Sequence, residues 1–327
     1  MAVTLKHLAQ QLGLSVSTVS RVLSGSRDTV IAEATARRVR ALAEELGYQP
    51  NRSARALVTG RSCAVALWMN NLYSSFHALV AHLVYERLHG AGYEVLVRCM
   101  EQVPQVVRLG SGHVDGILAH DCAGALAMYL RHRARRAMPI VSMGGYVVRS
   151  VDHVEIDLYA GAVEAVHHLV DVGCRRIAYL VNAESRQQGD GRRDGYDAAV
   201  REHGLTPEYI ISVDQARASA REAVRHHVAA NGLPDGLFCH NDEMAIGAYR
   251  GLCDLGIRVP QDVALVGCDG IEDTEYLEVP ITTIRQPLEL MCDRAWNLLK
   301  RRMAEPDAEP EGIVLQPELA IRASTRR

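Results

Sequence analysis

The stretch Leu14-Ser15-Val16-Ser17-Thr18-Val19-Ser20-Arg21-Val22-Leu23 decides the fold at the start of this 327-residue chain. Ser15 has the place of an N-cap, and Val19 and Val22 fall on one face of the helix that follows it. Directly before this stretch, Gly13 ends another helical pattern. Two helices joined by so short a turn predict a helix-turn-helix motif.

Helical patterns lie on both sides of the stretch from Leu14 to Leu23. The first begins after the capping residue Thr4. Another runs from about Glu33 to Leu46 and stops at Gly47. The apolar positions that should form a shared core are Leu5, Leu8, Ala9, Leu12, Val39, Leu42 and Leu46. Residues 1–49 are therefore expected to form a small all-helical domain.

The first turn of the second helix should project Val16, Ser17 and Arg21 outward, where the major groove of DNA would lie. Arg21 can donate two hydrogen bonds to guanine, Ser17 can pair with several base edges, and Val16 can pack on a thymine methyl group. The short hydroxyl side chains suited to phosphate contacts are those of Thr4, Ser15, Thr18 and Ser20. The alternative from periodicity alone is that Val16 is a core residue and Arg21 a solvated cation.

Charge is divided unequally along the chain. Residues 1–60 carry a net charge of +4, and because the whole chain carries −3, the remainder carries −7. A basic head on an acidic body indicates that the head meets a polyanion. The apolar fraction of 48% is ordinary for a globular protein. Because the start lacks the pattern of a secretory signal, a cytoplasmic protein without a membrane segment is expected.

The cysteines and histidines give no sign of a metal site or disulfide framework. The eight cysteines are scattered without a Cys-x-x-Cys spacing, as expected of reduced thiols. The pairs His167-His168 and His226-His227 are adjacent in sequence, and neighbours on a helix point about 100° apart. No metal and no cofactor are therefore expected.

The segment Pro50-Asn51-Arg52-Ser53-Ala54-Arg55-Ala56-Leu57 lies between the helical head and a longer pattern that begins at Cys63. A helix of about two turns is marginal in water, because nucleation costs more than so few hydrogen bonds return. Such a helix needs a partner, and DNA is the partner that the basic head implies. The alternative is an Ala-rich linker with an incidental leucine.

From Cys63 onward, short apolar runs alternate with amphipathic helices, which predicts an α/β body with parallel sheets covered by helices. The length implies two such lobes. The apolar runs expected to be strands are 64–69, 93–97, 116–119, 140–143, 177–181, 236–240 and 263–267. Ligands of open α/β sheets bind at the carboxyl ends of the strands, so polar residues after these runs should line a cleft between the lobes.

Polar groups suited to a polyol or sugar follow several of these runs. The expected cleft residues are Asn70, Tyr73, Phe76, His120, Arg192, Asn241, Asp242, Asp269 and Gln286. The alternative is that Asn241-Asp242 caps the following helix and Asp269 anchors a loop.

The sequence resembles the lactose-repressor-type (LacI/GalR) transcription regulators. The resemblance is carried at the start of the chain by Thr4-Leu5, by the stretch from Leu14 to Leu23 and by Leu46-Gly47-Tyr48-Gln49-Pro50-Asn51-Arg52-Ser53-Ala54-Arg55-Ala56-Leu57. It continues through Val114-Asp115-Gly116-Ile117-Leu118, Asn241-Asp242, Val266-Gly267-Cys268-Asp269 and Thr282-Thr283-Ile284-Arg285-Gln286-Pro287. It therefore spans almost the whole chain.

The resemblance implies a hinge helix over 50–60 and a two-lobed, periplasmic-binding-protein-like body over 61–327. The first lobe would comprise about 61–156 and 286–313, and the second about 157–285 and 314–327, with a parallel sheet in each. Val16, Ser17 and Arg21 would read an operator half-site, and Leu57 would enter the minor groove beside Leu57 of a second subunit. The other hinge residues implied in DNA contact are Asn51, Arg52 and Ala54.

The resemblance also implies a repressor controlled by a small effector, with Arg192, Asn241 and Asp269 at the usual effector positions. The chain departs from the family pattern at Tyr73-Ser74-Ser75-Phe76, which replaces Asn-Pro-Phe-Phe, and at Gln215, which replaces an aromatic residue. With so few aromatics, the cleft favours a sugar, or a sugar acid paired with Arg192, over a flat purine.

Partners and competing functions follow from the same resemblance. The expected partners are double-stranded, near-palindromic operator DNA, a sugar-like effector and a second copy of the chain. A homodimer is expected, since the C-terminus lacks a leucine-heptad extension. A corepressor-dependent or activating regulator, an exported solute-binding protein and an enzyme using Asp242, Asp269 and His240 remain as alternatives.

Overall fold

The computed structural model describes residues 3–24, 31–48, 61–100, 114–131, 138–183, 185 and 190–326. The chain divides into two compact units, residues 1–62 and 63–327. The hinge helix predicted over 50–60 lies outside the described residues, and so do Asn51, Arg52, Ala54 and Leu57.

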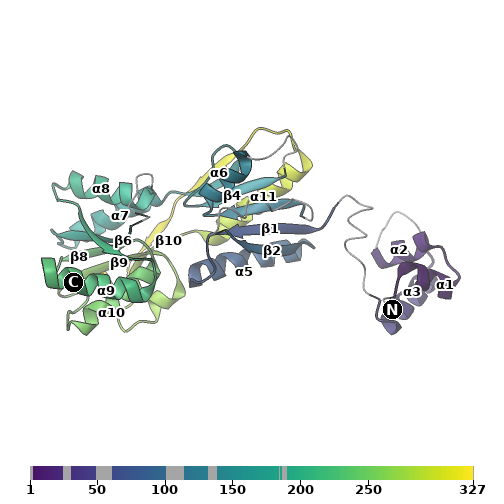
Figure 1. Cartoon of the computed structure of the whole chain (residues 1–327), viewed down its shortest axis with the longest axis horizontal. Coiled ribbons are helices and arrows are strands. Elements are labelled where there is room, and N and C mark those ends of the chain that lie inside the picture. The colour runs from purple at the N-terminus through teal and green to yellow at the C-terminus, as the bar shows by residue number, and fades with distance from the viewer. Residues whose placement is uncertain are drawn as a thin grey trace. The chain divides into compact units, whose positions relative to one another are not determined.

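The first unit contains the helices α1 (Leu5–Leu12), α2 (Val16–Ser24) and α3 (Glu33–Glu45), which pack around one core (Figure 1). The Thr4 hydroxyl accepts a hydrogen bond from the His7 amide at 3.3 Å and so begins α1. Gly13 ends that helix in the left-handed region, at φ 67°. The buried apolar side chains of this core are Leu8, Ala9, Val19, Val22, Ala36, Val39 and Ala43.

The body begins with a parallel sheet in the order β11-β5-β4-β3-β1-β2. Its strands are β1 (Ala64–Met69), β2 (Glu94–Cys99), β3 (Gly116–His120), β4 (Ile140–Gly144), β5 (Asp152–Ile156) and β11 (Gly312–Leu315). The helices of this first lobe are α5 (Ser75–Gly90), α6 (Ala123–Arg131) and α11 (Leu288–Ala304). The fully buried strands β1, β3 and β4 are mostly apolar, with His120 and Ser142 as their buried polar residues, as strands covered on both faces require.

The second lobe repeats this plan with a sheet in the order β12-β10-β9-β8-β6-β7, parallel except for the edge strand β12. The strands are β6 (Ile177–Asn182), β7 (Glu208–Ser212), β8 (Gly236–Cys239), β9 (Ala264–Asp269), β10 (Thr282–Arg285) and β12 (Glu318–Ala320). The helices are α7 (Leu158–Asp171), α8 (Gly191–Glu202), α9 (Arg217–Asn231) and α10 (Asp242–Asp254), with short 3-10 turns η2 (Glu272–Glu275) and η3 (Ala323–Thr325).

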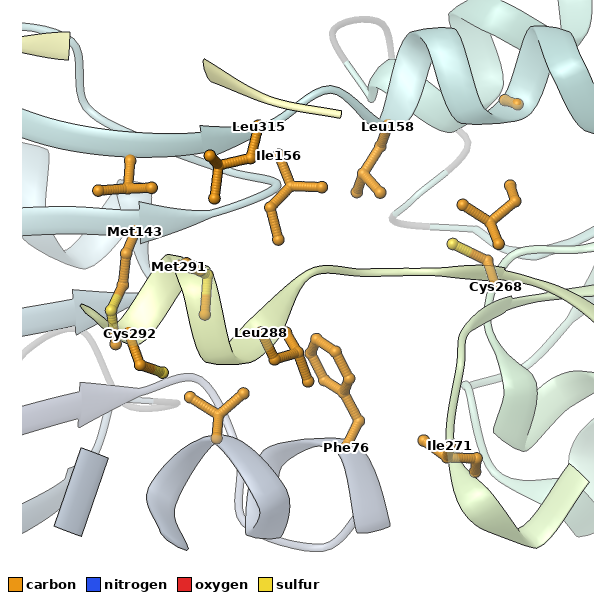
Figure 2. Close-up of a cluster of buried hydrophobic side chains, with 14 of the residues drawn as sticks. Phe76, Met143, Ile156, Leu158, Cys268, Ile271, Leu288, Met291, Cys292 and Leu315 are labelled. Carbon is orange, nitrogen blue, oxygen red and sulfur yellow. The ribbon is translucent and has the colours of Figure 1, made fainter. Parts of the chain in front are cut away.

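The described chain passes between the lobes at three places, from β5 to α7, from β10 to α11 and from β11 to β12. Apolar side chains cover these crossings. Figure 2 shows Leu158 and Leu288 beside two of them, with Phe76 next to Leu288. The lobes therefore share a hydrophobic core at the crossings, and the carboxyl ends of the strands open beside it. Within the described residues, no helix has the length and apolarity needed to cross a membrane.

Candidate DNA-contacting helix and effector cavity

The start of α2 presents the predicted DNA-contacting side chains on the exposed side of the first unit. Val16 is 45% exposed, while Val19, one turn further on, is fully buried. Ser17 and Arg21 are exposed as well. Val16 is thus not a core residue, which was the alternative reading of its sequence position.

The hydroxyl groups before α2 form a compact cluster. Ser15 Oγ accepts a hydrogen bond from the Thr18 amide at 3.1 Å and lies 2.8 Å from both Ser17 Oγ and Thr18 Oγ1. Thr4 and Ser15 are exposed, and Thr18 and Ser20 are half-buried. Because a hydroxyl both donates and accepts, Ser15 can cap the helix and still donate to an anion such as phosphate.

In the body, the cleft between the lobes holds a cavity of about 510 Å³. The structure brings several predicted effector residues to its wall. These are Asn70 and Phe76 from the first lobe, Gln286 at a crossing, and Arg192, Asn241 and Asp269 from the second lobe. They come from segments that lie far apart in the sequence and meet because parallel strands end at the same sheet edge.

Asp242, which was predicted to contact the effector, does not line this cavity. Its carboxylate is fully buried and accepts hydrogen bonds from the amides of Gly270 at 2.7 Å and Ile271 at 2.9 Å. The Thr283 hydroxyl donates to its other oxygen at 2.7 Å. Asp242 therefore holds the loop that carries Asp269.

His120 and Tyr73 do not line this cavity either. His120 is fully buried behind the cavity wall, with ring centroids 5.6 Å from Phe76 and 5.8 Å from His77. Burial lowers its pKa, so its ring is neutral. Tyr73 is 92% exposed and lines a second hollow that shares part of its wall with the cavity, so its contact with an effector stays a prediction.

Several cavity residues were missed by the sequence reasoning. They are His77, Asp121, Tyr146 and Asp190. Asp121 and Tyr146 follow the predicted strands 116–119 and 140–143 by two and three residues, and Asp190 stands where a helix cap precedes Arg192, so these three had a usable signal. The contact between Tyr146 and Arg192 had none, because only the meeting of the lobes makes it.

Arg192 is the centre of the cavity's polar network. Its Nη1 donates to the His240 carbonyl at 3.0 Å, and its Nη2 donates to the Tyr146 hydroxyl at 2.6 Å. Asp190 Oδ1 lies 3.6 Å from Nε and Asp269 Oδ1 lies 3.9 Å from Nη1. Nε is buried and has no hydrogen-bond partner among the described residues. The guanidinium is thus held by groups of both lobes.

The Asp190–Arg192 pair is charged. Burial opposes ionisation of Asp190, but Arg192, His240 and the hydrogen bond donated by Tyr146 outweigh burial and lower the pKa of the carboxyl. The Asp190 carboxylate also caps α8 by accepting from the amides of Arg192 at 2.9 Å and Arg193 at 3.4 Å. The charge of Arg192 is therefore largely balanced before any ligand enters.

The pKa of Asp269 is shifted in the opposite direction from that of Asp190. Burial and the neighbouring Asp242 raise its pKa well above the usual range, although Arg192 opposes this shift. Gln286 Nε2 donates to Asp269 Oδ1 at 2.8 Å, while Gln286 Oε1 lacks a partner among the residues that the structure describes. The Asp269 carboxyl and the Gln286 amide therefore place hydrogen-bonding groups side by side at the cavity wall.

The cavity histidines are neutral at pH 7. Burial and the charge of Arg192 lower the pKa of His240 to about 3, and Tyr179 Oη lies 2.8 Å from its Nδ1. Burial, with His120 as a further cause, lowers the pKa of His77 to about 4. His77 Nδ1 lies 2.6 Å from Ser74 Oγ.

Replacing His77 by asparagine should reduce the loss of stability on acidification. Below pH 6.5 the unfolded chain protonates this imidazole while the folded chain does not, so stability falls between pH 6.5 and 4. Each pH unit in that window costs at most about 1.4 kcal/mol. Urea unfolding at pH 7 and 5 should therefore show a loss smaller by about 1–2 kcal/mol in His77→Asn than in the parent.

Asparagine keeps an acceptor opposite Ser74 at the position of Nδ1, so the helix start is preserved. His82→Asn, which removes an exposed imidazole from the same helix, is the matched control. An equal loss between pH 7 and 5 in the parent and His77→Asn would show that His77 does not titrate differently on folding.

An exposed α2 start and a polar cavity between two sheets define a class of protein, the DNA-binding regulator that responds to a small molecule. Residues 4–51 match the family model described as "Bacterial regulatory proteins, lacI family", and residues 166–325 match the "Periplasmic binding protein-like domain". The chain is 30% identical over 332 residues to the HTH-type transcriptional repressor PurR of Photobacterium profundum, covering 99% of this chain and 98% of the relative. Against PurR of Aliivibrio fischeri the identity is 32% over 333 residues, with 98% of each chain covered.

The chain therefore belongs to the lacI family of DNA-binding transcription repressors, and the resemblance read from its sequence is confirmed. Among solved structures, the "transcriptional regulator CelR-cellobiose complex" is 30% identical, covers 98% of this chain and 99% of its own, and has a TM-score of 0.70. The Lac repressor dimer bound to operator and the anti-inducer ONPF is 24% identical, covers 99% of each chain and has a TM-score of 0.86, which supports the fold.

Proposed function

We propose that this repressor binds a near-palindromic operator as a homodimer and that a sugar or sugar acid in the cavity between its lobes controls operator affinity. The observation that carries the proposal is the network around Arg192, which joins side chains of both lobes at the wall of the cavity. A ligand bound there would contact both lobes at once.

The chemistry of the cavity favours a ligand rich in hydroxyl groups. Amide side chains, neutral imidazoles and the Asp269 carboxyl offer hydrogen-bond donors and acceptors. Cavities of roughly 300–1,000 Å³ suit small molecules. The CelR relative, which is bound to cellobiose, supports a sugar-like effector.

Control of DNA binding requires a free-energy coupling between the two ligands. Tyr146 of the first lobe donates to Asp190 and accepts from Arg192 of the second, so a ligand that rearranges these bonds changes how the lobes meet. Such couplings are typically about 1–3 kcal/mol and must be reciprocal. Operator DNA should change effector affinity by the same factor as the effector changes operator affinity.

The test is a titration of both ligands. A thermal-shift screen of sugars and sugar acids identifies a binding compound, and fluorescence anisotropy then measures operator affinity with and without it. Calorimetry measures effector affinity with and without the operator. Equal and reciprocal factors support the proposal, and independent binding contradicts it. The direction of the change decides between an inducer and a corepressor.

Arg21, exposed on α2, should determine how well the head distinguishes one base sequence from another. Arg21→Ala should weaken operator binding by about 1–3 kcal/mol, because a bidentate contact to guanine is lost. Binding to a scrambled duplex of equal length serves as the control, since phosphate contacts do not depend on sequence. A parallel fall of affinity for both duplexes would assign Arg21 to phosphate instead.

The proposal assigns no catalytic role to the alternative acid–base set. His240 is neutral and its Nδ1 lies against the Tyr179 hydroxyl, while Asp242 is engaged by two amides and a hydroxyl. Prolonged incubation with the bound sugar should therefore return it unchanged. Product formation that depends on Asp242, Asp269 or His240 would favour an enzyme.

A further inference from the structure

A second hollow adjoins the effector cavity and shares part of its wall. It also has a volume of about 510 Å³, and its own lining includes Tyr73, Asp214, Arg217 and Glu243. We call it the mouth compartment. The residues that line both it and the inner cavity are Asn71, His77, Gln215, Asn241 and Asp269. Because so much lining is shared, the two hollows are parts of one continuous cleft.

A fixed polar edge separates the two parts. Asn241 Nδ2 donates to Gln215 Oε1 at 2.9 Å, and Gln215 Nε2 donates to Ser185 Oγ at 3.1 Å. Asn241 Oδ1 accepts from the Met244 amide at 2.8 Å and caps α10. These bonds hold both amide groups in place, so a ligand that spans the cleft meets a pre-arranged hydrogen-bonding edge midway.

Tyr73 gives the mouth compartment an apolar face. Its side chain is 92% exposed, although a tyrosine ring carries a large apolar surface. The turn that presents it is defined by the Tyr73 amide, which donates to Asn71 Oδ1 at 3.3 Å. A sugar ring has one face of C–H groups that packs on an aromatic ring, while its hydroxyls reach the polar groups around it.

The charges on the opposite side are arranged in pairs. Arg217 donates to Glu243 and, at 2.9 Å, to Asp273, and Glu243 Oε1 accepts from the Ser75 amide of the first lobe at 3.4 Å. An arginine already bonded to two carboxylates is a poor site for a further anion. The carboxylate oxygens beside Arg217 can still accept hydrogen bonds from the hydroxyl groups of a ligand. The mouth compartment therefore suits a neutral, hydroxylated ring.

We propose that the effector of this repressor is a two-ring glycoside, with one ring in the inner cavity and the second in the mouth compartment against Tyr73. This inference rests on the proposed sugar control of the cleft and adds the size of the ligand and the residue that selects it. A single ring would occupy the inner cavity and leave Tyr73 without a contact.

The experiment compares each monosaccharide with its disaccharides on the full-length protein. Calorimetry with glucose, cellobiose and maltose, and with galactose, lactose and melibiose, should show at least one disaccharide binding more tightly than its monosaccharide. Tyr73→Ala should weaken that disaccharide about five- to tenfold and leave the monosaccharide unchanged. Tyr73→Phe should restore the parent affinity. Tyr276→Ala is the matched control, because Tyr276 is 78% exposed and is not among the residues lining the described hollows.

The outcomes separate this inference from the function on which it rests. Tighter disaccharide binding that Tyr73→Ala abolishes supports it. Equal affinity for one and two rings, or a disaccharide affinity that Tyr73→Ala leaves unchanged, overturns it while the sugar-controlled repressor stands. If no sugar or sugar acid binds at all, the proposed effector class fails and the two-ring inference fails with it.

Discussion

Replacing Arg192 by methionine should lower the free energy of unfolding of the body by about 3–5 kcal/mol. The reason is that the substitution leaves the Asp190 carboxylate buried without its charged partner. Asp190 is buried and charged, and Arg192 is the closest described cation to it, at 3.6 Å. Methionine fills much of the volume of the arginine but supplies no charge and no donor, so the Tyr146 hydroxyl and the His240 carbonyl lose a partner as well.

Urea unfolding at pH 7 measures this effect, and two further variants identify its cause. Arg201→Met removes an exposed arginine from the same helix, where its ion pair with Asp197 is worth at most about 1 kcal/mol. Asp190→Asn combined with Arg192→Met removes both charges, so the double variant should recover part of the loss. If Arg192→Met costs less than about 1 kcal/mol, the pair is not the buried ion pair described here.

The strands that the sequence revealed are fully buried ones, with the exposed edge strand β2 as the exception. The predicted runs correspond to β1, β2, β3, β4, β6, β8 and β9, with shifts of one or two residues at their ends. β5 alternates buried with half-buried positions, and β7 mixes buried and exposed ones, so neither forms a continuous apolar run. The strands β10, β11 and β12 are short and depend on pairing with distant segments.

The residues of the cavity could likewise be predicted only in part from the sequence. Asn241 and Asp242 are adjacent, and sequence reasoning placed both in the cleft. Asn241 is the extended N-cap of α10 and Asp242 its first helical residue, and their side chains diverge: Asn241 lines the cavity, whereas Asp242 bonds the loop after β9. Tyr146 meets Arg192 across the cleft, and nothing local to either residue predicts that contact. The sequence predicts which residues follow a strand, but it does not predict the direction in which each of their side chains points.

Leu8→Ala should abolish operator binding and leave the body folded. Leu8 is fully buried in the core of the first unit, with Val19 and Val39 as its fully buried neighbours. Removing so large a buried side chain costs about 2–5 kcal/mol. A domain of this size rarely has more than about 3–5 kcal/mol of stability. The helix-turn-helix would therefore be largely unfolded, and the exposed residues of α2 would lose the frame that aligns them.

Hydrogen exchange measured by mass spectrometry separates the two units of the chain. Peptides from residues 3–24 and 31–48 should lose protection in Leu8→Ala, while peptides from β1 and β6 keep it. Glu44→Ala is the control, because Glu44 is exposed near the carboxyl end of α3, where a negative charge is unfavourable. Effector binding should survive in both variants. Loss of protection throughout the body of Leu8→Ala would mean that the two units do not unfold separately, and ligand control would then act on the folding of the whole chain.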